Sequence, residues 1–281
     1  MGIIEQELER MGVIYGALEP IRERDGVHVA RVRRAGETLI IKAFEGGGQS
    51  REIGNYAVLR SLGVPTLRVL GSTDRALLLE DLEGGNYRPG RPEDLDDPEA
   101  AALIARWYRE LHGRGYAHVE SAGEGLYDEN DALTAENIEA VRARTGELPV
   151  WRLIEANWGR IRAAIDGARR TLTYNDFYYT NLAVARDGSS ALMFDYGLLG
   201  KGYAYADVRN VLSSLSPAAG EAFLAGYGPF DAREEQIDGV ANVLLGLCWA
   251  YGRAAPPPWA EALLAELRDD MYARVERLIG E

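Results

Sequence analysis

The hydrophobic positions in the first part of the chain predict a small antiparallel sheet. Residues 27–32 and 38–44 are strand-like runs on either side of a turn at residues 34–37, so we expect them to pair. Residues 67–71 and 76–80 form a second such pair around a Ser-Thr-Asp turn. Strands joined by short turns lie next to each other and run antiparallel, which is the arrangement expected here.

Apolar residues that recur every three to four positions predict helices in the rest of the chain. Residues 51–62 predict one helix between the two strand pairs. After Asp97-Pro98 the pattern is mainly helical, and the first of these helices is expected to stop at Gly113. The other predicted helices cover residues 153–165, begin at Ser216-Pro217, begin at Asp231 with a capping box to Glu234, and run from Pro258 to Leu278. The fold class is therefore α+β.

A third strand pair is predicted late in the chain. Residues 182–185 and 191–194 are short apolar runs that flank Asp187-Gly188, and this pattern indicates a β-hairpin. Asn181 comes directly before the first run and Asp195 directly after the second. Because a hairpin folds its two ends back beside each other, we expect these two polar side chains to be neighbours.

Asp176, Asn181 and Asp195 have the spacing required for phosphoryl transfer from a metal-bound nucleoside triphosphate. A kinase catalytic loop places Asp and Asn with four residues between them, and a second Asp opens the following Asp-Phe-Gly segment, here Asp-Tyr-Gly. Asp176 is the candidate catalytic base. Asn181 and Asp195 are candidate metal ligands, because Mg²⁺ prefers oxygen. The alternative interpretation is that these residues only cap two surface strands.

Lys42 interrupts an apolar strand, as does the kinase lysine that contacts the α- and β-phosphates. A lysine in such a position is costly unless an opposite charge pairs with it. Glu52 is the candidate partner, and Asn55, about one turn further along the same predicted helix, is the alternative. An edge-strand lysine that reaches water would show the same sequence pattern.

Polarity and glycine content rise together at residues 80–85, which indicates a hinge. In a two-lobed kinase the hinge backbone offers an N–H and a C=O to adenine, so Glu80, Asp81 and Leu82 are candidate nucleotide-binding residues. A glycine-rich cover over the phosphates would lie near residues 22–26. Because that stretch holds a single glycine, the cover is assigned by position and not by motif.

The order of these features resembles the aminoglycoside phosphotransferase and choline kinase-like family of small-molecule kinases. The resemblance covers most of residues 20–215, and it is most specific in the loop that ends at Asn181, where the family usually has His-Gly-Asp, four residues and Asn. The family's segment from a metal-binding Asp through Gly to a structural Asp is matched at Asp195, Gly202 and Asp207.

The resemblance implies a two-lobed protein kinase-like fold, with residues 1–83 as the nucleotide-binding lobe and residues 84–281 as a helical lobe that carries the catalytic loop and the acceptor site. It also implies ATP or GTP as donor, Mg²⁺ as cofactor, and phosphorylation of a hydroxyl on a small molecule. An aminoglycoside antibiotic is the first candidate acceptor, which would make the chain a resistance enzyme. Choline, a sugar or a glycated amine are the alternatives.

Three positions depart from the usual loop of this family. Tyr174 stands where the family has His, Asn175 where it has Gly, and Tyr178 where a cationic residue is common. The last change leaves more of the transition-state charge to Mg²⁺ and Lys42. Because the three acidic or amide groups persist, we expect an active enzyme, and the alternative is a nucleotide-binding pseudokinase.

Composition limits the partners. The chain has 281 residues, a formal charge of −13 and a pI near 4.9, which argues against a nucleic-acid partner and favours a cationic acceptor. No stretch has the length of a membrane span, no membrane partner is expected, and no secretory signal is visible. Cys248 is the single cysteine, which is consistent with the reducing cytoplasm. The oligomeric state is left open.

Overall fold

The computed structural model describes residues 2–34 and 36–280, and contacts between them define two units. The first unit runs to Gly115 and also contains Tyr174–Leu199 and Asn210–Gly228. The second unit contains Tyr116–Thr173, Gly200–Arg209 and the described residues from Pro229 onward. The division into lobes at residue 83, which the resemblance implies, stays a prediction.

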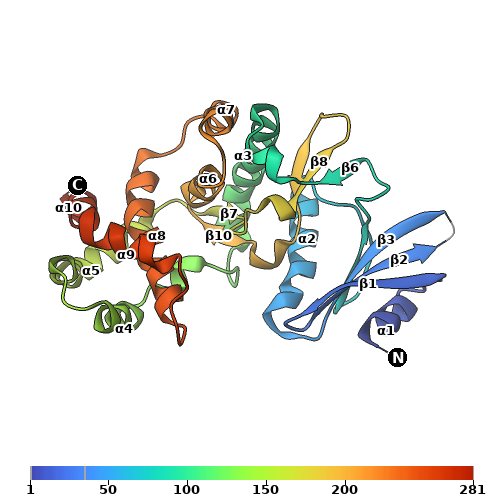
Figure 1. Cartoon of the computed structure of the whole chain (residues 1–281), viewed down its shortest axis with the longest axis horizontal. Helices are drawn as coiled ribbons and strands as arrows, with labels where there is room; N and C mark the ends of the chain where they lie inside the picture. Colours follow the sequence, from blue (N-terminus) through green and yellow to red (C-terminus); the bar gives the residue numbers. More distant parts are fainter. Residues whose placement is uncertain (1, 35, 281) are drawn as a thin grey trace. The chain divides into compact units, whose positions relative to one another are not determined.

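The two strand pairs expected near the N-terminus are confirmed, and they belong to one antiparallel sheet in the first unit (Figure 1). In the order of their pairing the five strands are β1 (Ala17–Arg24), β2 (Val27–Arg34), β3 (Glu37–Phe44), β5 (Ala76–Glu80) and β4 (Val69–Ser72). Ala35, in the predicted turn between β2 and β3, lies outside the described residues.

Strand β1 and helix α1 (Ile3–Arg10) were not expected from the sequence. β1 has no apolar alternation, because it is an edge strand on which only Leu18 and Glu19 are half-buried. Asp25 and Gly26 join it to β2 with φ of 52° and 74°, the left-handed pair of a tight hairpin turn. Helix α1 lies beside the sheet (Figure 1). Its Leu8 is buried in an apolar cluster with residues of β2, β3 and β5.

Helix α2 (Arg51–Leu62) has the bounds that the periodicity predicts. Its buried residues are Glu52, Asn55, Tyr56 and Leu59, so the inward face carries a carboxylate and an amide beside apolar side chains. Gly63 ends the helix in the left-handed conformation that glycine adopts without steric cost, with φ of 70°.

The predicted hairpin at residues 182–194 is confirmed, with β8 (Leu182–Ala185) paired to β9 (Ala191–Met193). A short strand, β6 (Tyr87–Pro89), joins the free side of β8. Leu182 lies opposite Met193. This register places the residues that precede and follow the hairpin next to each other, which matters for the candidate site.

Helix α3 (Pro98–Ala122) starts where the sequence predicts, but the expected stop at Gly113 is wrong. Leu111, His112 and Gly115 around this glycine are buried, so packing maintains the helix across a residue that costs about 1 kcal/mol relative to alanine. Helix α7 (Pro217–Tyr227) opens after Ser216 as expected.

The second unit is mainly helical. Its elements are α4 (Ala135–Thr145), α5 (Pro149–Gly167), β7 (Thr171–Thr173), β10 (Gly200–Gly202), the start of α6 (Ala204–Leu212), α8 (Ala232–Tyr251), α9 (Ala260–Asp269) and α10 (Met271–Gly280). Strands β7 and β10 pair antiparallel. Trp151, Ile154, Leu244 and Met271 are among the residues of its buried core.

One expectation about these helices is corrected, and the predicted N-cap at Asp231 is confirmed. The last predicted helix is two helices, because the run ends at Asp269 and restarts at Met271. The break falls at consecutive aspartates, which are weak helix formers, and α10 packs on α5 as well as on α8. The capping residue Asp231 accepts a hydrogen bond from the N–H of Arg233, while Glu234 accepts one from the N–H of Tyr205.

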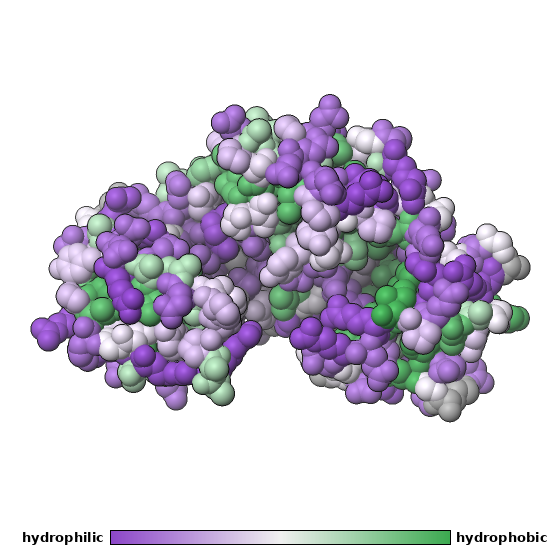
Figure 2. Space-filling view, viewed as in Figure 1, coloured by the Kyte–Doolittle hydropathy of each residue, from purple (hydrophilic) through white to green (hydrophobic). Residues whose placement is uncertain are grey.

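The face of the molecule seen in Figure 2 is largely polar. Figure 2 shows hydrophilic residues over most of the visible face, with hydrophobic residues in smaller groups among them. None of the helices in the described part of the chain combines the length and apolar character needed to cross a bilayer.

Candidate active site

Strand β3 and helix α2 place opposite charges against each other in the first unit. Lys42 Nζ lies 2.5 Å from Oε2 of Glu52 and 2.7 Å from Oδ1 of Asp195. Lys42 sits opposite Val29 on one neighbouring strand and opposite Leu77 on the other. It is therefore in the interior of the sheet, which rules out the edge-strand interpretation.

Asn55, the alternative partner for Lys42, is used elsewhere. Its Nδ2 donates a hydrogen bond of 2.7 Å to the main-chain oxygen of Tyr196 and a longer one of 3.5 Å to that of Leu199. Helix α2 thus directs its carboxylate, Glu52, to the lysine and its amide to the segment that carries Asp195.

Asp176 and Asn181 contact each other within one short loop. Asn181 Nδ2 donates to the Oδ2 of Asp176 at 3.0 Å and to its main-chain oxygen at 3.1 Å. The main-chain oxygen of Asn181 accepts a hydrogen bond of 2.9 Å from the N–H of Phe194, the residue before Asp195. The hairpin therefore brings the third polar residue back to the loop, as the sequence predicts.

These side chains line one cavity of about 1090 Å³, and all of its lining belongs to the first unit. Every residue that the sequence proposes for the site takes part: Lys42, Glu52, Glu80, Asp81, Leu82, Asp176, Asn181 and Asp195. Apolar walls complete the cavity, including Ile21, Val29, Ile40, Leu67, Leu79 and Phe194. The lining therefore combines apolar side chains with a lysine, carboxylates and an amide.

A family model described as the phosphotransferase enzyme family matches residues 22–237. The matched segment is more than half of the chain, and it contains every residue that the sequence proposes for the site. The chain belongs to the phosphotransferase enzyme family. No curated protein matches the sequence.

Solved structures support the fold of this phosphotransferase. The macrolide 2′-phosphotransferase from Brachybacterium faecium is 17% identical with a TM-score of 0.62, over 94% of this chain and 96% of that one. A spectinomycin phosphotransferase bound to ADP and spectinomycin is 11% identical with a TM-score of 0.63, over 100% and 94%. The choline kinase from Streptococcus pneumoniae is 14% identical with a TM-score of 0.61, over 99% and 98%. The protein kinase-like α+β fold class is thereby confirmed.

Two residues of the phosphotransferase loops adopt left-handed backbone conformations, Asn175 with φ of 65° and Asp195 with φ of 64°. Position 175 is where the family usually has Gly. Glycine adopts this conformation freely, and asparagine is among the few other residues that visit it routinely. The change from Gly to Asn is therefore compatible with the backbone that the loop requires.

Tyr174, the fully buried departure, keeps a donor at the position of the family's His. Its hydroxyl donates a hydrogen bond of 2.5 Å to the main-chain oxygen of Phe194, directly before Asp195. Its ring meets that of Tyr196 edge to face, with centroids 5.9 Å apart. Tyr178, by contrast, is 63% exposed.

The hinge makes polar contacts with two arginines that sequence reasoning missed. Arg31 Nε donates to Asp81 at 2.6 Å, while Arg186 donates to the main-chain oxygens of Leu82 and Glu83 at 3.0 and 3.3 Å. Both arginines line the cavity. Their contacts span 50 and 104 residues of chain for Asp81 and Leu82, so no local pattern signals them.

Charge and burial shift the titration of the central groups. Burial raises the pKa of Glu52 to about 7, against the opposing attraction of Lys42. The pKa of Lys42 is also raised, because the attraction of Glu52 and Asp195 outweighs the effect of burial. The ammonium group of Lys42 is shared between two carboxylates, of which Glu52 is the more buried. The shared charge does not fully offset the burial of Glu52, so the pKa of Glu52 stays raised. Burial and the nearby charge of Asp195 raise the pKa of Asp176.

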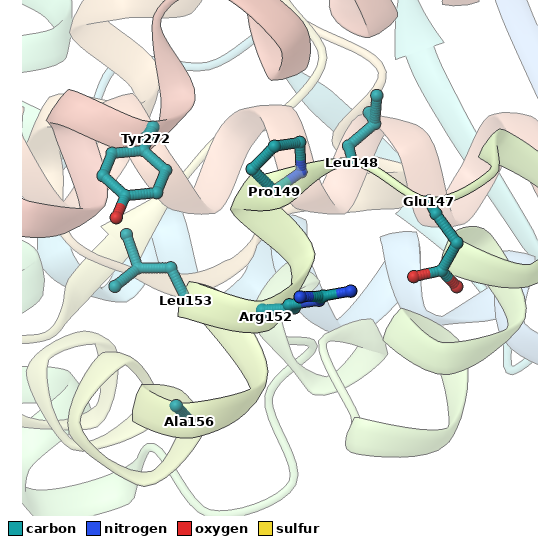
Figure 3. Close-up of a pocket in the computed structure, with 7 residues that line it drawn as sticks. All are labelled: Glu147, Leu148, Pro149, Arg152, Leu153, Ala156 and Tyr272. Atoms are coloured by element: carbon teal, nitrogen blue, oxygen red, sulfur yellow. The ribbon is translucent and has the colours of Figure 1, made fainter.

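A second cavity lies in the helical unit and involves different residues. It is lined by residues that come from the segment before α5, from the first turns of α5 and from α10: Glu147, Leu148, Pro149, Arg152, Leu153, Ala156 and Tyr272 (Figure 3). None of the proposed site residues is among them.

Proposed function

We propose that this phosphotransferase transfers the γ-phosphate of ATP, with Mg²⁺ as cofactor, to a hydroxyl of a small, cationic molecule. The observation that supports the proposal is the convergence of Lys42, Glu52, Asp176, Asn181 and Asp195 on one cavity. An ADP complex among the similar structures supports an adenine nucleotide as donor. We expect the reaction in the cytoplasm, where ATP is available.

The donor atoms at the polar end of the cavity fit Mg²⁺. Asn181 uses its Nδ2 on Asp176, which leaves Oδ1 for a cation, and Asp195 uses Oδ1 on Lys42, which leaves Oδ2. Hard oxygen donors of this kind, together with phosphate oxygens, are the ligands that Mg²⁺ prefers. When bound, the cation would neutralise charge on the phosphate oxygens.

Each of the remaining residues has a distinct role in the proposal. Lys42 binds the α- and β-phosphates, and Glu52 orients it. The hinge backbone at Glu80, Asp81 and Leu82 faces the purine, which lies between the apolar walls. The acceptor oxygen forms a bond to the γ-phosphorus while the bond from that phosphorus to the β,γ-bridging oxygen breaks, and the proton of the hydroxyl passes to Asp176. A raised pKa makes Asp176 a stronger base for this transfer.

Two observations bear on the acceptor, the net charge of the chain and the substrates named for similar structures. The formal charge of −13 favours a cation, since a negative surface concentrates positively charged ligands. Antibiotics and choline both occur among the substrates named for similar structures, so the aminoglycoside-like acceptor and the metabolite alternative are both carried into the test.

The proposal is tested by measuring ADP release from ATP with a panel of aminoglycosides, macrolides, choline, ethanolamine, sugars and glycated amines. We expect at least one acceptor to raise ADP release well above the rate without acceptor, and mass spectrometry to find the acceptor heavier by one phosphate. Nucleotide binding without turnover on any acceptor would favour the pseudokinase alternative.

The base assignment is tested by Asp176→Asn. A positioned base contributes about 10²- to 10⁴-fold, so kcat should fall by about two orders of magnitude or more while ADP affinity stays near that of the wild type. Asp187→Asn is the matched control, because Asp187 lies in the exposed turn of the β8–β9 hairpin. Full activity of Asp176→Asn on an identified acceptor would show that the base is a different group.

A further inference from the structure

Asp195, the proposed metal ligand, has a left-handed backbone conformation, with φ of 64° and ψ of 70°. This region is disfavoured for most residues with a Cβ, and aspartate is one of the few that adopt it. Such a conformation persists when surrounding contacts fix it, and it sets the direction of the side chain. The contacts around this segment therefore bear on where the carboxylate points.

Main-chain oxygens on both sides of Asp195 accept hydrogen bonds from side chains. The pairs are Tyr196 Oη to Met193 O, Tyr174 Oη to Phe194 O at 2.5 Å, Asn55 Nδ2 to Tyr196 O at 2.7 Å, Arg51 Nε to Gly197 O at 2.5 Å, and Asn175 Nδ2 to Leu198 O at 3.0 Å. We call residues 193–198 the Asp195 segment. Each of its carbonyls other than that of Asp195 thus has a side-chain donor.

One of the five donors, Tyr196, belongs to the Asp195 segment itself, and the other four come from the two parts of the site that must act together. Arg51 and Asn55 lie on α2, the helix whose Glu52 pairs with Lys42. Tyr174 and Asn175 immediately precede Asp176, the proposed base. The Asp195 segment is therefore connected on one side to the phosphate-binding lysine and on the other to the catalytic loop.

The two asparagines differ from the other donors in what they contribute. Asn55 is 6% exposed, so its amide hydrogen-bonds to a carbonyl with little competition from water. Asn175 is half-buried, so water has reduced access to its hydrogen bond. Tyr174 and Tyr196 also fill the aromatic core, where their rings pack against Trp107. The asparagines are thus the cleaner places to remove a hydrogen bond from the Asp195 segment.

We propose that Asn55 and Asn175 are positioning residues that hold the Asp195 segment in the conformation in which Asp195 receives the metal ion. The inference rests on the proposed function, since it takes Asp195 as a metal ligand. It predicts that loss of either amide weakens metal binding, while the purine end of the cavity is unaffected.

The test measures Mn²⁺ binding to the ADP complex by electron paramagnetic resonance, with ADP affinity in the absence of metal measured separately by calorimetry. For Asn55→Leu and Asn175→Gly we expect Mn²⁺ affinity to fall by about 5- to 50-fold, the range that corresponds to one lost buried hydrogen bond. ADP affinity without metal should change by less than about twofold, since the hinge contacts remain.

The choice of Gly at position 175 separates the hydrogen bond from backbone strain. Asn175→Gly keeps the left-handed backbone accessible and removes only the amide, whereas Asn175→Ala removes the amide and adds strain. The alanine variant should therefore bind Mn²⁺ more weakly than the glycine variant. If Asn55→Leu does not fold, as thermal unfolding would show, the two variants at position 175 decide the question.

A matched control is available in the second unit. Asn157 Nδ2 donates to the main-chain oxygen of Leu153 at 2.9 Å, so Asn157→Leu removes the same kind of hydrogen bond outside the site. This variant should bind Mn²⁺ as the wild type does.

Asp195→Asn separates a failure of the proposed metal site from a failure of the positioning role of the two asparagines. If it retains wild-type Mn²⁺ affinity, Asp195 is not a metal ligand and the proposed function fails at that point. If Asp195→Asn loses Mn²⁺ binding but Asn175→Gly and Asn55→Leu keep wild-type affinity, the positioning role is wrong and the metal site stands.

Discussion

At the scale of single residues, burial and pairing compete most directly at Glu52. Removing a carboxylate from water raises its pKa, and the ammonium group of Lys42 at 2.5 Å opposes that shift without cancelling it. The same lysine also serves Asp195 at 2.7 Å. A cation bound at Asp195 would add positive charge beside Glu52, so we infer that metal binding favours the ionised form of Glu52.

Glu129, in the second unit, gives a cleaner case for a pH prediction. Burial raises the pKa of its carboxyl to about 8, with Asp207 adding to the shift and Arg209 opposing it. Because this pKa lies above the usual value of 4.5, the folded state holds the proton more tightly than the unfolded state. The stability associated with Glu129 is therefore fully present below about pH 4.5 and is lost as the pH rises toward 8.

The variant Glu129→Gln should remove this dependence. We expect it to match the wild type at pH 4 and to be more stable by about 1–3 kcal/mol at pH 9, a fraction of the ~5 kcal/mol that the full shift would represent. Urea unfolding at a series of pH values measures the difference. An equal free energy of unfolding for the two proteins across this range would contradict the raised pKa.

At the scale of elements, we expect Gly→Ala substitutions at Gly113 and at Gly246, each inside a helix, to have opposite effects on stability. A Cβ added at Gly113 in α3 meets no atom within 4 Å, whereas one added at Gly246 in α8 lies 2.4 Å from Cδ1 of Leu263. Gly113→Ala should therefore stabilise the protein by about 0.5–1 kcal/mol through helix propensity. Gly246→Ala should destabilise it, because the side chain of Leu263 on α9 must leave its present position to make room for the new Cβ.

Thermal and urea unfolding of both variants measure these effects. The pair forms its own control, since each replaces glycine by alanine in a helix interior. Stabilisation by both substitutions would mean that the packing of α8 on α9 is looser than the structure indicates.

Gly113 also shows what local patterns determine and what they leave open. Periodicity gave the bounds of α2 and the hairpin of β8 and β9, because each has a one-sided apolar pattern with punctuation at both ends. A glycine in a long helix has the same local signal whether the chain stops or continues. Packing on both sides of Gly113 decides in favour of continuation, and packing is not a local property.

In the candidate site, too, some residues follow from local spacing and others depend on contacts that form only in the folded chain. The catalytic loop and the Asp195 segment have short, fixed spacings, so their residues were predictable from the chain and from its resemblance to a family. The spacing left both Glu52 and Asn55 open as partners of Lys42. The hydrogen bond from Asn55 to Tyr196 spans 141 residues, and such a contact is determined only when the chain is folded.

At the scale of the whole molecule, charge is unevenly distributed. Eight cationic and seven acidic side chains line the large cavity of the first unit, so its lining is close to neutral in a chain with a formal charge of −13. A polyanionic nucleotide therefore meets little local repulsion there. The excess negative charge resides in the rest of the chain, where it would attract a cationic acceptor before the acceptor makes any specific contact.

This distribution predicts how ionic strength affects turnover. Because the screening length falls from about 30 Å at 0.01 M salt to about 8 Å at 0.15 M, kcat/KM for a cationic acceptor should decrease over that range, by roughly three- to tenfold. An uncharged analogue of the same acceptor should change by less than about twofold, and it serves as the control for salt effects on nucleotide binding. The measurement is the initial rate of ADP release at saturating MgATP. Equal salt dependence for both acceptors would show that the negative charge of the chain does not guide the acceptor, and the argument for a cation would then have to rest on contacts within the acceptor site.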